Sequence, residues 1–497
     1  MSAYRSTMKH LLRIACLGAL GAGSALAVEF ALEDDRLTLK AERAPLREVL
    51  QRFADSGVLV KMDPDLDVLV TGSCADAPVD EALDALLQPF AYVALWELVP
   101  GPVSNLPRLA EIQVYRPGSP DRAAPLPAEP SRLNLARGPL PDSPWFVADE
   151  VLVRVRGGTR LEEFRLLLKQ LGATVTGSLP ELGVYQLRLP QGVNVLDLVE
   201  QLKRNPMLAG VEPNFAKRLD RSREAAPDDA VAGVAAPGVL AGAPPLAILD
   251  SGLLAGVGGL EKAVVGQYNA VFPKNEMGDP QGHGTQMALV AAGAVQPQGV
   301  AADGEGPPLL AVRAFDEEGA TSNFAIMRAL QYALSKGARV VNLSWGTETD
   351  SAFLADAIAY AQQKGAVIVA AAGNEPTGRA VYPAAYDGVI AVSALNGDGS
   401  VWDRSNRGAF VTVSAPGRAT LPVGHAGPPG SYAGTSIASA YVARELALYF
   451  ARNPQATAAD ARKALQQAVT DAGAKGRDPL HGHGALDAAA ARRLRGL

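Results

Sequence analysis

The sequence predicts an α/β protein: a doubly wound, mostly parallel sheet over residues 246–497, preceded by two small α+β domains. Short, continuously apolar runs alternate with helical stretches throughout that last region, which is the pattern of buried parallel strands. Two Pro-rich or Ala/Pro-rich segments, residues 117–148 and 219–245, read as linkers. At 497 residues the chain is also longer than one hydrophobic core usually organises.

Residues 1–27 are predicted to be a signal peptide. Three basic residues precede an apolar run at residues 14–22, and the small residues at 25–27 suit cleavage by signal peptidase. The run is shorter than the roughly 20 apolar residues that a membrane-spanning helix needs. We therefore expect an exported protein with no membrane span in the mature chain.

The composition excludes one class of partner. Lys and Arg total 46 against 52 Asp and Glu, which gives a formal net charge of −6. A protein that binds nucleic acid through a general basic field is not expected at this balance. The 48% of hydrophobic residues suffices for sizeable cores.

Residues 28–116 form the first predicted domain. Two helices open alike, with Ala-Pro-Leu at 44–46 and Ala-Pro-Val at 77–79, and strands are expected at 58–62 and 92–98. Proline suits the first turn, where its missing N–H is harmless. The layout resembles the secretin and TonB short N-terminal domain of Gram-negative envelope proteins, and an unrelated small α/β domain is the alternative. The resemblance implies a Gram-negative periplasmic or extracellular location and an envelope protein as a possible partner.

Residues 149–218 form the second predicted domain. Strands at 151–155 and 184–189 alternate with period two, and amphipathic helices are expected at 161–171 and 195–202. The order strand, helix, strand, strand, helix, strand is a ferredoxin-like layout. Alone, it indicates only a small α/β module.

Residues 246–497 carry the predicted parallel sheet. The expected strands are residues 246–249, 309–313, 339–342, 366–370 and 389–392, with helices at 323–335 and 351–363. A doubly wound sheet binds its ligand at the carboxyl ends of its strands. Polar residues at those ends are therefore candidate site residues.

Four such residues stand in short motifs. Asp250 begins Asp-Ser-Gly, His283 lies in Gly-His-Gly-Thr, Asn374 follows Ala-Ala-Gly, and Ser436 lies in Gly-Thr-Ser. Each alone reads as a turn residue, a surface histidine or a helix cap. Together, the order Asp, His, Ser is one of the known arrangements of the acyl-transfer triad.

The chemistry assigns each group a role. Ser436 needs a base to become a nucleophile, and His283 titrates near neutral pH. Asp250 would fix the tautomer of the imidazole and stabilise the imidazolium. The amide of Asn374 and the backbone N–H of Ser436 would bind the oxyanion.

The four motifs resemble those of the subtilisin-like serine proteases, the subtilase family. This resemblance implies a serine endopeptidase that acts on polypeptides through an acyl-enzyme. It also implies that the substrate cleft is lined by Ser344, Trp345, Gly346, Ala371, Ala372 and Gly373. Trp345 would lie near the fourth subsite, where we expect small or flat side chains.

The resemblance bears on metals too. Residues 296–301 look short for the loop that holds a structural calcium in many relatives, so no metal or other cofactor is predicted.

The resemblance also implies a role for the second domain, which ends in Val-Glu-Pro-Asn at 211–214. It is similar to the family's propeptide, which assists folding and then inhibits the protease. We expect self-cleavage within residues 215–245. Two alternatives stay open: a catalytically silent binding scaffold, and an envelope signalling protein whose protease acts on one partner.

Overall fold

The computed structural model describes residues 28–496, apart from residues 34, 67, 89, 101–104, 126–131, 141, 220–233, 235–237, 241, 274 and 426. The expected signal peptide lies outside these residues. Two compact units make up the chain. One comprises Met1–Glu129, Val153–Val193 and Leu202–Gly210, and the other comprises Pro130–Leu152, Asn194–Gln201 and Val211–Leu497.

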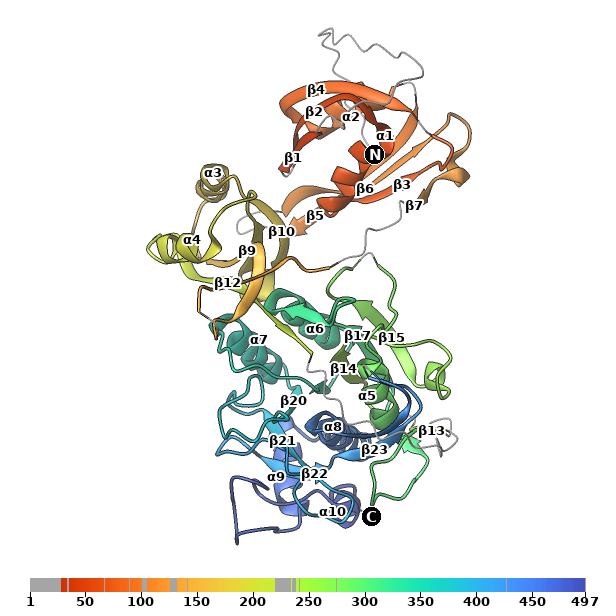
Figure 1. The fold of residues 1–497 in the computed structure, drawn as a ribbon, viewed down its shortest axis with the longest axis vertical. Coiled ribbons are helices and arrows are strands. Elements are labelled where there is room, and N and C mark those ends of the chain that lie inside the picture. The colour runs from red at the N-terminus through yellow and green to blue at the C-terminus, as the bar shows by residue number, and fades with distance from the viewer. Residues whose placement is uncertain are drawn as a thin grey trace. The chain divides into compact units, whose positions relative to one another are not determined.

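The first residues of the first unit form two sheets and two helices (Figure 1). One sheet has the order β1-β2-β4, with β1 at Glu29–Glu33, β2 at Arg36–Pro45 and β4 at Leu69–Pro78. The other has the order β5-β6-β3-β7, with bounds Ala91–Pro100, Asn105–Tyr115, Leu59–Met62 and Ala124–Pro125. Helices α1 (Leu46–Asp55) and α2 (Val79–Leu87) each follow a strand that ends in proline.

The two prolines differ slightly from their predicted place. Pro45 and Pro78 stand at the N-cap positions and not in the first turn. Their fixed φ suits the extended conformation of a strand end, and each stops the ladder before the helix begins. The side chains of Leu50, Phe53 and Leu83 are fully buried in the core that the helices share with the sheets.

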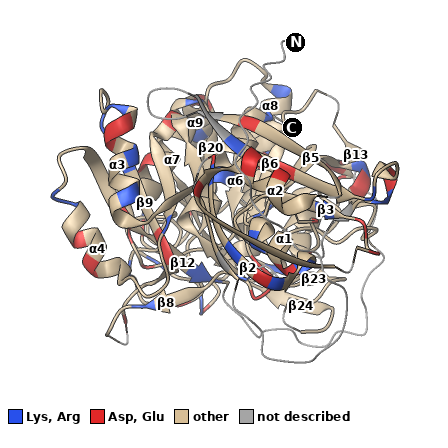
Figure 2. Ribbon diagram, turned by 90° about the horizontal axis from the view of Figure 1, so that it is seen from above, with Lys and Arg blue, Asp and Glu red and all other residues tan. Residues whose placement is uncertain are grey.

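The next elements run β9 (Trp145–Val155), α3 (Leu161–Leu171), β10 (Thr174–Leu179), β11 (Val184–Arg188), α4 (Val195–Leu202) and β12 (Leu208–Arg218). Their sheet has the order β10-β11-β9-β12, with β18 (Ala320–Ser322) beyond β12. The acidic residues of α3, Glu162 and Glu163, lie in its first turn, and the basic residues Arg165 and Lys169 follow them (Figure 2). The division between the two compact units falls within the predicted linker 117–148, between Glu129 and Pro130, and also passes through β9 and β12.

The expected Pro-rich spacer contributes strands. Residues Leu135–Arg137 form β8, which pairs antiparallel with β9, and β9 itself begins at Trp145 within the predicted linker. Pairing with the first residues of β9 satisfies backbone groups that a solvated spacer would leave to water. The predicted linker is therefore not one continuous spacer, because a short paired strand lies within it.

The second unit contains a seven-stranded sheet of order β15-β17-β14-β19-β20-β21-β22. Every neighbouring pair in it is parallel, so the predicted α/β region with a mostly parallel sheet is confirmed. The bounds are Leu246–Asp250 for β14, Val264–Asn269 for β15, Leu309–Arg313 for β17, Val340–Leu343 for β19, Val367–Ala371 for β20, Ile390–Leu395 for β21 and Val413–Pro416 for β22. The strand order reverses beside β14, where an open sheet places its ligand site.

Helices cover the two faces of this sheet. They are α5 (His283–Ala291), α6 (Asn323–Ser335), α7 (Ala352–Gln363), α8 (Thr435–Arg452), α9 (Ala458–Ala468) and α10 (Ala488–Leu494). Alternate strand residues such as Leu246, Ile248 and Val369 join one core cluster with α5 and α8. Helices α6 and α7 pack against each other and against strands of the same sheet. A short hairpin, β23 (Arg418–Leu421) with β24 (Gly430–Ala433), precedes α8.

Among the residues that the structure describes, no helix is both long enough and apolar enough to cross a membrane.

Candidate active site

The carboxylate of Asp250 and the imidazole of His283 meet at the centre of the site. Asp250 is the last residue of β14, and His283 is the first residue of α5. His283 Nδ1 lies 2.7 Å from Asp250 Oδ1, and both side chains are buried. Because an ionised carboxylate only accepts, Nδ1 carries the proton and the neutral ring keeps Nε2 as its basic nitrogen.

Two opposing effects set the pKa of His283. Burial disfavours the protonated ring, whereas the charge and the hydrogen bond of Asp250 favour it, with a further contribution from Asp279. The net result is a pKa raised above the usual 6.5, although the ammonium of Lys217 lowers it. A protonated His283 ring is therefore stabilised in place by Asp250.

A second buried carboxylate, Asp279, holds the start of α5. Its Oδ1 accepts from Ser251 Oγ at 2.7 Å and from Gly282 N at 3.0 Å. Its Oδ2 accepts from Thr285 N at 2.7 Å and from Thr285 Oγ1 at 2.6 Å. Sequence reasoning missed this residue, and the one signal was its place four residues before His283.

The glycines of two motifs allow the strand end and the helix start to touch. A Cβ on Gly252, whose φ is +133°, would lie 1.8 Å from Gly278 O. A Cβ on Gly284 would lie 2.4 Å from Gly252 O. This close approach explains why glycine is the last residue of the Asp-Ser-Gly motif and the residue directly after His283.

Ser436 is the second residue of α8. Its Oγ donates to Ser344 O at 2.9 Å, and Ser344 Oγ lies 3.2 Å from Ser436 O. These bonds tie the start of α8 to the segment that follows β19. The Ser436 backbone N–H lies in the first turn of a long helix, where the helix dipole favours negative charge.

Asn374 lies three residues after β20, with its amide oriented by Thr435. Asn374 Oδ1 accepts from Thr435 N at 3.0 Å and from Thr435 Oγ1 at 2.9 Å. Thr435 Oγ1 in turn accepts from Gly373 N at 3.2 Å. With its oxygen held by two donors, the amide directs its NH₂ group away from Thr435. Thr435 is a positioning residue that the sequence did not single out.

The remaining predicted residues lie at or directly after the carboxyl ends of β19 and β20. Ser344, Trp345, Ala371 and Ala372 are buried. A Cβ on Gly346 would lie 2.1 Å from Val381 Cγ1, and Gly373 has a φ of +105°, which favours glycine. Trp345 Nε1 donates to Leu249 O at 3.0 Å, which fixes the indole beside the residue that precedes Asp250.

The end of β12 pairs with β18 next to this tryptophan. The pairing is antiparallel, with Lys217 opposite Thr321, and Leu219 N extends it by donating to Gly319 O at 2.8 Å. Lys217 Nζ lies 4.7 Å from the centroid of the Trp345 ring and donates to Gly346 O at 2.6 Å. The side chain that the structure places against Trp345 is long and charged, unlike the small or flat substrate side chains expected there. An indole held by its N–H presents a π-face that attracts a cation.

A second histidine lies against the first. The His283 and His425 ring centroids are 4.8 Å apart at an interplanar angle of 59°, and His425 is buried. His425 Nδ1 contacts Gln281 O at 3.1 Å, so Nδ1 carries the proton. His425 lies between β23 and β24, and nothing in its sequence surroundings pointed to this contact.

No group of three or more His, Cys, Asp or Glu side chains that could hold a metal ion occurs within the described part of the chain. The carboxylates that follow residues 296–301 pair with guanidinium groups. Arg495 Nη1 lies 2.7 Å from Asp303 Oδ2, and Arg452 Nη2 lies 2.6 Å from Glu305 Oε2. Arg444 also pairs with Asp303.

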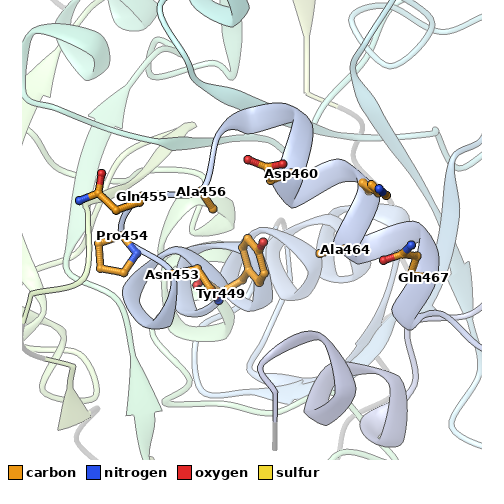
Figure 3. Close-up of a pocket in the computed structure, with 9 residues that line it drawn as sticks. Tyr449, Asn453, Pro454, Gln455, Ala456, Asp460, Ala464 and Gln467 are labelled. Carbon is orange, nitrogen blue, oxygen red and sulfur yellow. Dashed lines mark hydrogen bonds between the residues drawn. The ribbon is translucent and has the colours of Figure 1, made fainter.

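A hollow of about 460 Å³ opens between α8 and α9 (Figure 3). Its lining residues are Tyr449, Asn453, Pro454, Gln455, Ala456, Asp460, Lys463, Ala464 and Gln467. None of the candidate site residues lines it, and its lining includes no nucleophile with an adjacent base. It does not coincide with the site.

Comparison with known families gives two matches. The model of the subtilase family matches residues 244–484. The model of the fervidolysin N-terminal prodomain matches residues 140–214. Neither match extends into residues 28–116.

Individual relatives agree with these matches. The thermophilic serine proteinase of Bacillus sp. (strain AK1) is 31% identical over 314 residues, which cover 61% of this chain and 78% of that protein. Thermitase of Thermoactinomyces vulgaris is 34% identical over 199 residues, which cover 40% of this chain and 71% of that protein. The minor extracellular protease Epr of Bacillus subtilis is 32% identical over 48% of this chain, but the match spans only 37% of Epr.

Solved structures resemble the fold, and fervidolysin is one of them. Fervidolysin from Fervidobacterium pennivorans, described as a keratinolytic enzyme related to subtilisin, superposes with a TM-score of 0.56 at 23% identity. The alignment covers 73% of this chain and 63% of that one. At this identity the likeness concerns the fold alone.

Proposed function

Because the chain belongs to the subtilase family of serine-type endopeptidases, we propose that Asp250, His283 and Ser436 are its catalytic triad. The observation that carries the assignment is the 2.7 Å contact between His283 Nδ1 and Asp250 Oδ1. This contact leaves Nε2 of a buried imidazole as the base, as general-base catalysis requires.

Acyl transfer then proceeds on this chain's own groups. The Ser436 hydroxyl, which donates to Ser344 O, turns toward His283 Nε2 and gives up its proton as Oγ attacks the scissile carbonyl carbon. His283 next protonates the leaving amine, which breaks the peptide bond and leaves an acyl ester on Ser436. Water, deprotonated by His283, hydrolyses the ester and restores the free enzyme.

Two donors serve the oxyanion. The Asn374 NH₂ group and the Ser436 backbone N–H would bind the negative oxygen of each tetrahedral intermediate. The orientation of the amide by Thr435 supports this role, because the donors are aligned before substrate arrives. Residues 344–346 and 371–373 would line the cleft.

Residues 149–218 act as the propeptide in this proposal, and the protease is made as a zymogen. Two contacts of β12 support an inhibitory position. Ala216–Arg218 add a strand to β18 in the manner of a bound peptide. Glu212 caps α7, since its Oε1 accepts from Ala352 N at 2.8 Å and its Oε2 from Ser351 Oγ at 2.6 Å.

Self-processing is assigned to residues 215–245, of which residues 220–233, 235–237 and 241 lie outside the described part of the chain. The test is to express the full chain and its Ser436→Ala variant and compare their sizes and their digestion of casein. The proposal expects a shortened, active wild type and a full-length, inactive variant. Equal sizes of the two proteins would refute self-processing. Casein digestion by the Ser436→Ala variant would refute Ser436 as the nucleophile of the triad, and it would also exclude a catalytically silent scaffold.

The biological role proposed for residues 28–116 is contact with a protein of the Gram-negative envelope, with the protease exported to the periplasm or beyond. Its support is the sequence resemblance to the secretin and TonB short N-terminal domain, together with an independent core of two helices on two sheets. Digestion of one co-purifying envelope protein but not of casein would favour a regulator. Indiscriminate digestion would favour a scavenging protease.

A further inference from the structure

We propose that the substrate subsite at Trp345, the fourth before the scissile bond, selects a basic side chain, lysine or arginine. The inference deepens the proposed function and rests on it, since it names the substrate class of the same cleft. The chain's own Lys217 already occupies the position, and its contacts are those that a basic substrate residue would make.

Three groups surround the Lys217 ammonium. Nζ lies 4.7 Å from the centroid of the Trp345 ring and 5.9 Å from that of Phe315. It also donates to Gly346 O at 2.6 Å. Two aromatic faces and a carbonyl oxygen attract a cation, whereas an uncharged side chain of equal length would leave that oxygen without this donor.

The aromatic pair is rigid. Trp345 is 5% exposed, and its indole N–H is bonded to Leu249 O. Phe315 is fully buried and meets the Trp345 ring edge-on, with centroids 6.1 Å apart. Because the aromatic face is already in place, binding a basic side chain orders little besides that side chain itself. The entropic cost of binding is therefore low.

The contact between Lys217 and Trp345 lies next to the proposed catalytic residues. Trp345 follows Ser344, whose carbonyl accepts from Ser436 Oγ, and its indole is bonded to the residue before Asp250. The charge of Lys217 also reaches His283, whose pKa it lowers. A segment that carries Lys217 and pairs with β18 thus lies along the cleft in which a substrate would be cut.

The neighbouring basic residue offers an internal contrast. Arg218 lies 3.7 Å from Glu318, but both side chains are at least 40% exposed. Exposed ion pairs contribute little, because water and salt screen them. The selection for a basic side chain should consequently be strong at the position of Lys217 and weak at the next position toward the scissile bond.

The test uses processed enzyme from the full chain and quenched fluorescent peptides that differ only at the fourth residue before the cut. Lysine, arginine, norleucine and glutamate are compared at that residue by kcat/KM. Norleucine matches the lysine stem without its charge. We expect lysine and arginine to exceed norleucine by about tenfold, the size of a well-placed cation–π contact, and glutamate to be worst.

A matched pair of variants isolates the ring. Trp345→Phe and Trp345→Leu both lose the indole bond to Leu249, but only the first keeps an aromatic face. The ratio of lysine to norleucine should fall further in the leucine variant than in the phenylalanine variant, because only Phe315 and Gly346 O remain to attract the cation there. Equal ratios in the two variants would overturn the role of the ring.

Failure of this inference is distinct from failure of the proposed function. Cleavage of every peptide at similar rates by the wild type, with none by Ser436→Ala, would overturn the subsite assignment and leave the protease intact. A preference for a basic residue at the third position alone would overturn it too. Absence of cleavage by the wild type, or cleavage by the serine variant, would instead refute the proposed function.

Discussion

Replacing Asp250 by asparagine should lower kcat/KM and shift its pH dependence in a defined direction. The carboxylate is the group that raises the pKa of His283 against the effect of burial. Asparagine removes the charge but leaves the ring buried, so the pKa of His283 should fall. The acidic limb of kcat/KM reports the base of the free enzyme, and it should move to lower pH.

The structure bounds the size of the loss. The 2.7 Å bond between His283 Nδ1 and Asp250 Oδ1 is charge-assisted once the ring is protonated. Such bonds contribute roughly 1.5–3 kcal/mol, which corresponds to a loss of about 10- to 100-fold. If the asparagine NH₂ turns toward Nδ1, the ring adopts the wrong tautomer and the loss reaches about 10⁴-fold, as in serine proteases of an unrelated fold.

The assay is kcat/KM on a peptide substrate from pH 5 to pH 9, with Asp279→Asn as the matched control. Asp279 is equally buried and holds the same helix start, but its oxygens bond Ser251, Gly282 and Thr285 and not His283. The control should move the acidic limb less than Asp250→Asn does. A loss below about tenfold, or an acidic limb that stays in place in Asp250→Asn, would refute the reasoning.

Three further changes have expected outcomes. Asn374→Asp keeps the oxygen that Thr435 binds but removes the NH₂ donor. It should lower kcat by at least 10²-fold with little change in KM, which is the size of the effect at a subtilisin asparagine. An unchanged kcat would exclude Asn374 from the oxyanion site. Thr435→Val removes the hydroxyl that orients the Asn374 amide, and it should lower kcat by roughly tenfold, the equivalent of one neutral hydrogen bond. A change in KM alone would argue against a role of Thr435 in positioning Asn374. Arg444→Met removes the buried guanidinium whose Nη1 lies 2.5 Å from Glu445 Oε1, and it should lower the free energy of unfolding by about 3–5 kcal/mol. Thermal melting in a Ser436→Ala background measures this change, and an unchanged melting temperature would contradict the prediction.

The sequence sufficed where one signal dominated. The strand Leu309–Arg313 has the predicted bounds because a continuous apolar run needs no partner to be recognised. Asp250, His283, Asn374 and Ser436 could be proposed from the sequence because each stands near the end of such a run or at the start of a helix. Their motif glycines reflect close backbone approaches that leave a trace in the sequence.

Other features depend on partners that are distant in sequence. Strand β15 has exposed residues and a glycine, and pairs with β17 through an irregular register, so its apolar pattern is weak. His425 lies 142 positions from His283, and only the fold brings the two rings together. Lys217 reads as a solvated charge until the pairing of β12 with β18 places it over Trp345. The size of Trp345 suggested small or flat substrate side chains at that position, because the orientation of the indole could not be read from the sequence.

The most direct measurement is covalent labelling of the nucleophile. The processed enzyme is treated with a fluorophosphonate that reacts with activated serine hydroxyls, and the modified peptide is identified by mass spectrometry. The account predicts one modified residue, Ser436, with loss of peptidase activity in proportion to labelling, and much slower labelling in Asp250→Asn. Labelling at another serine, or full activity of an enzyme labelled at Ser436, would contradict it.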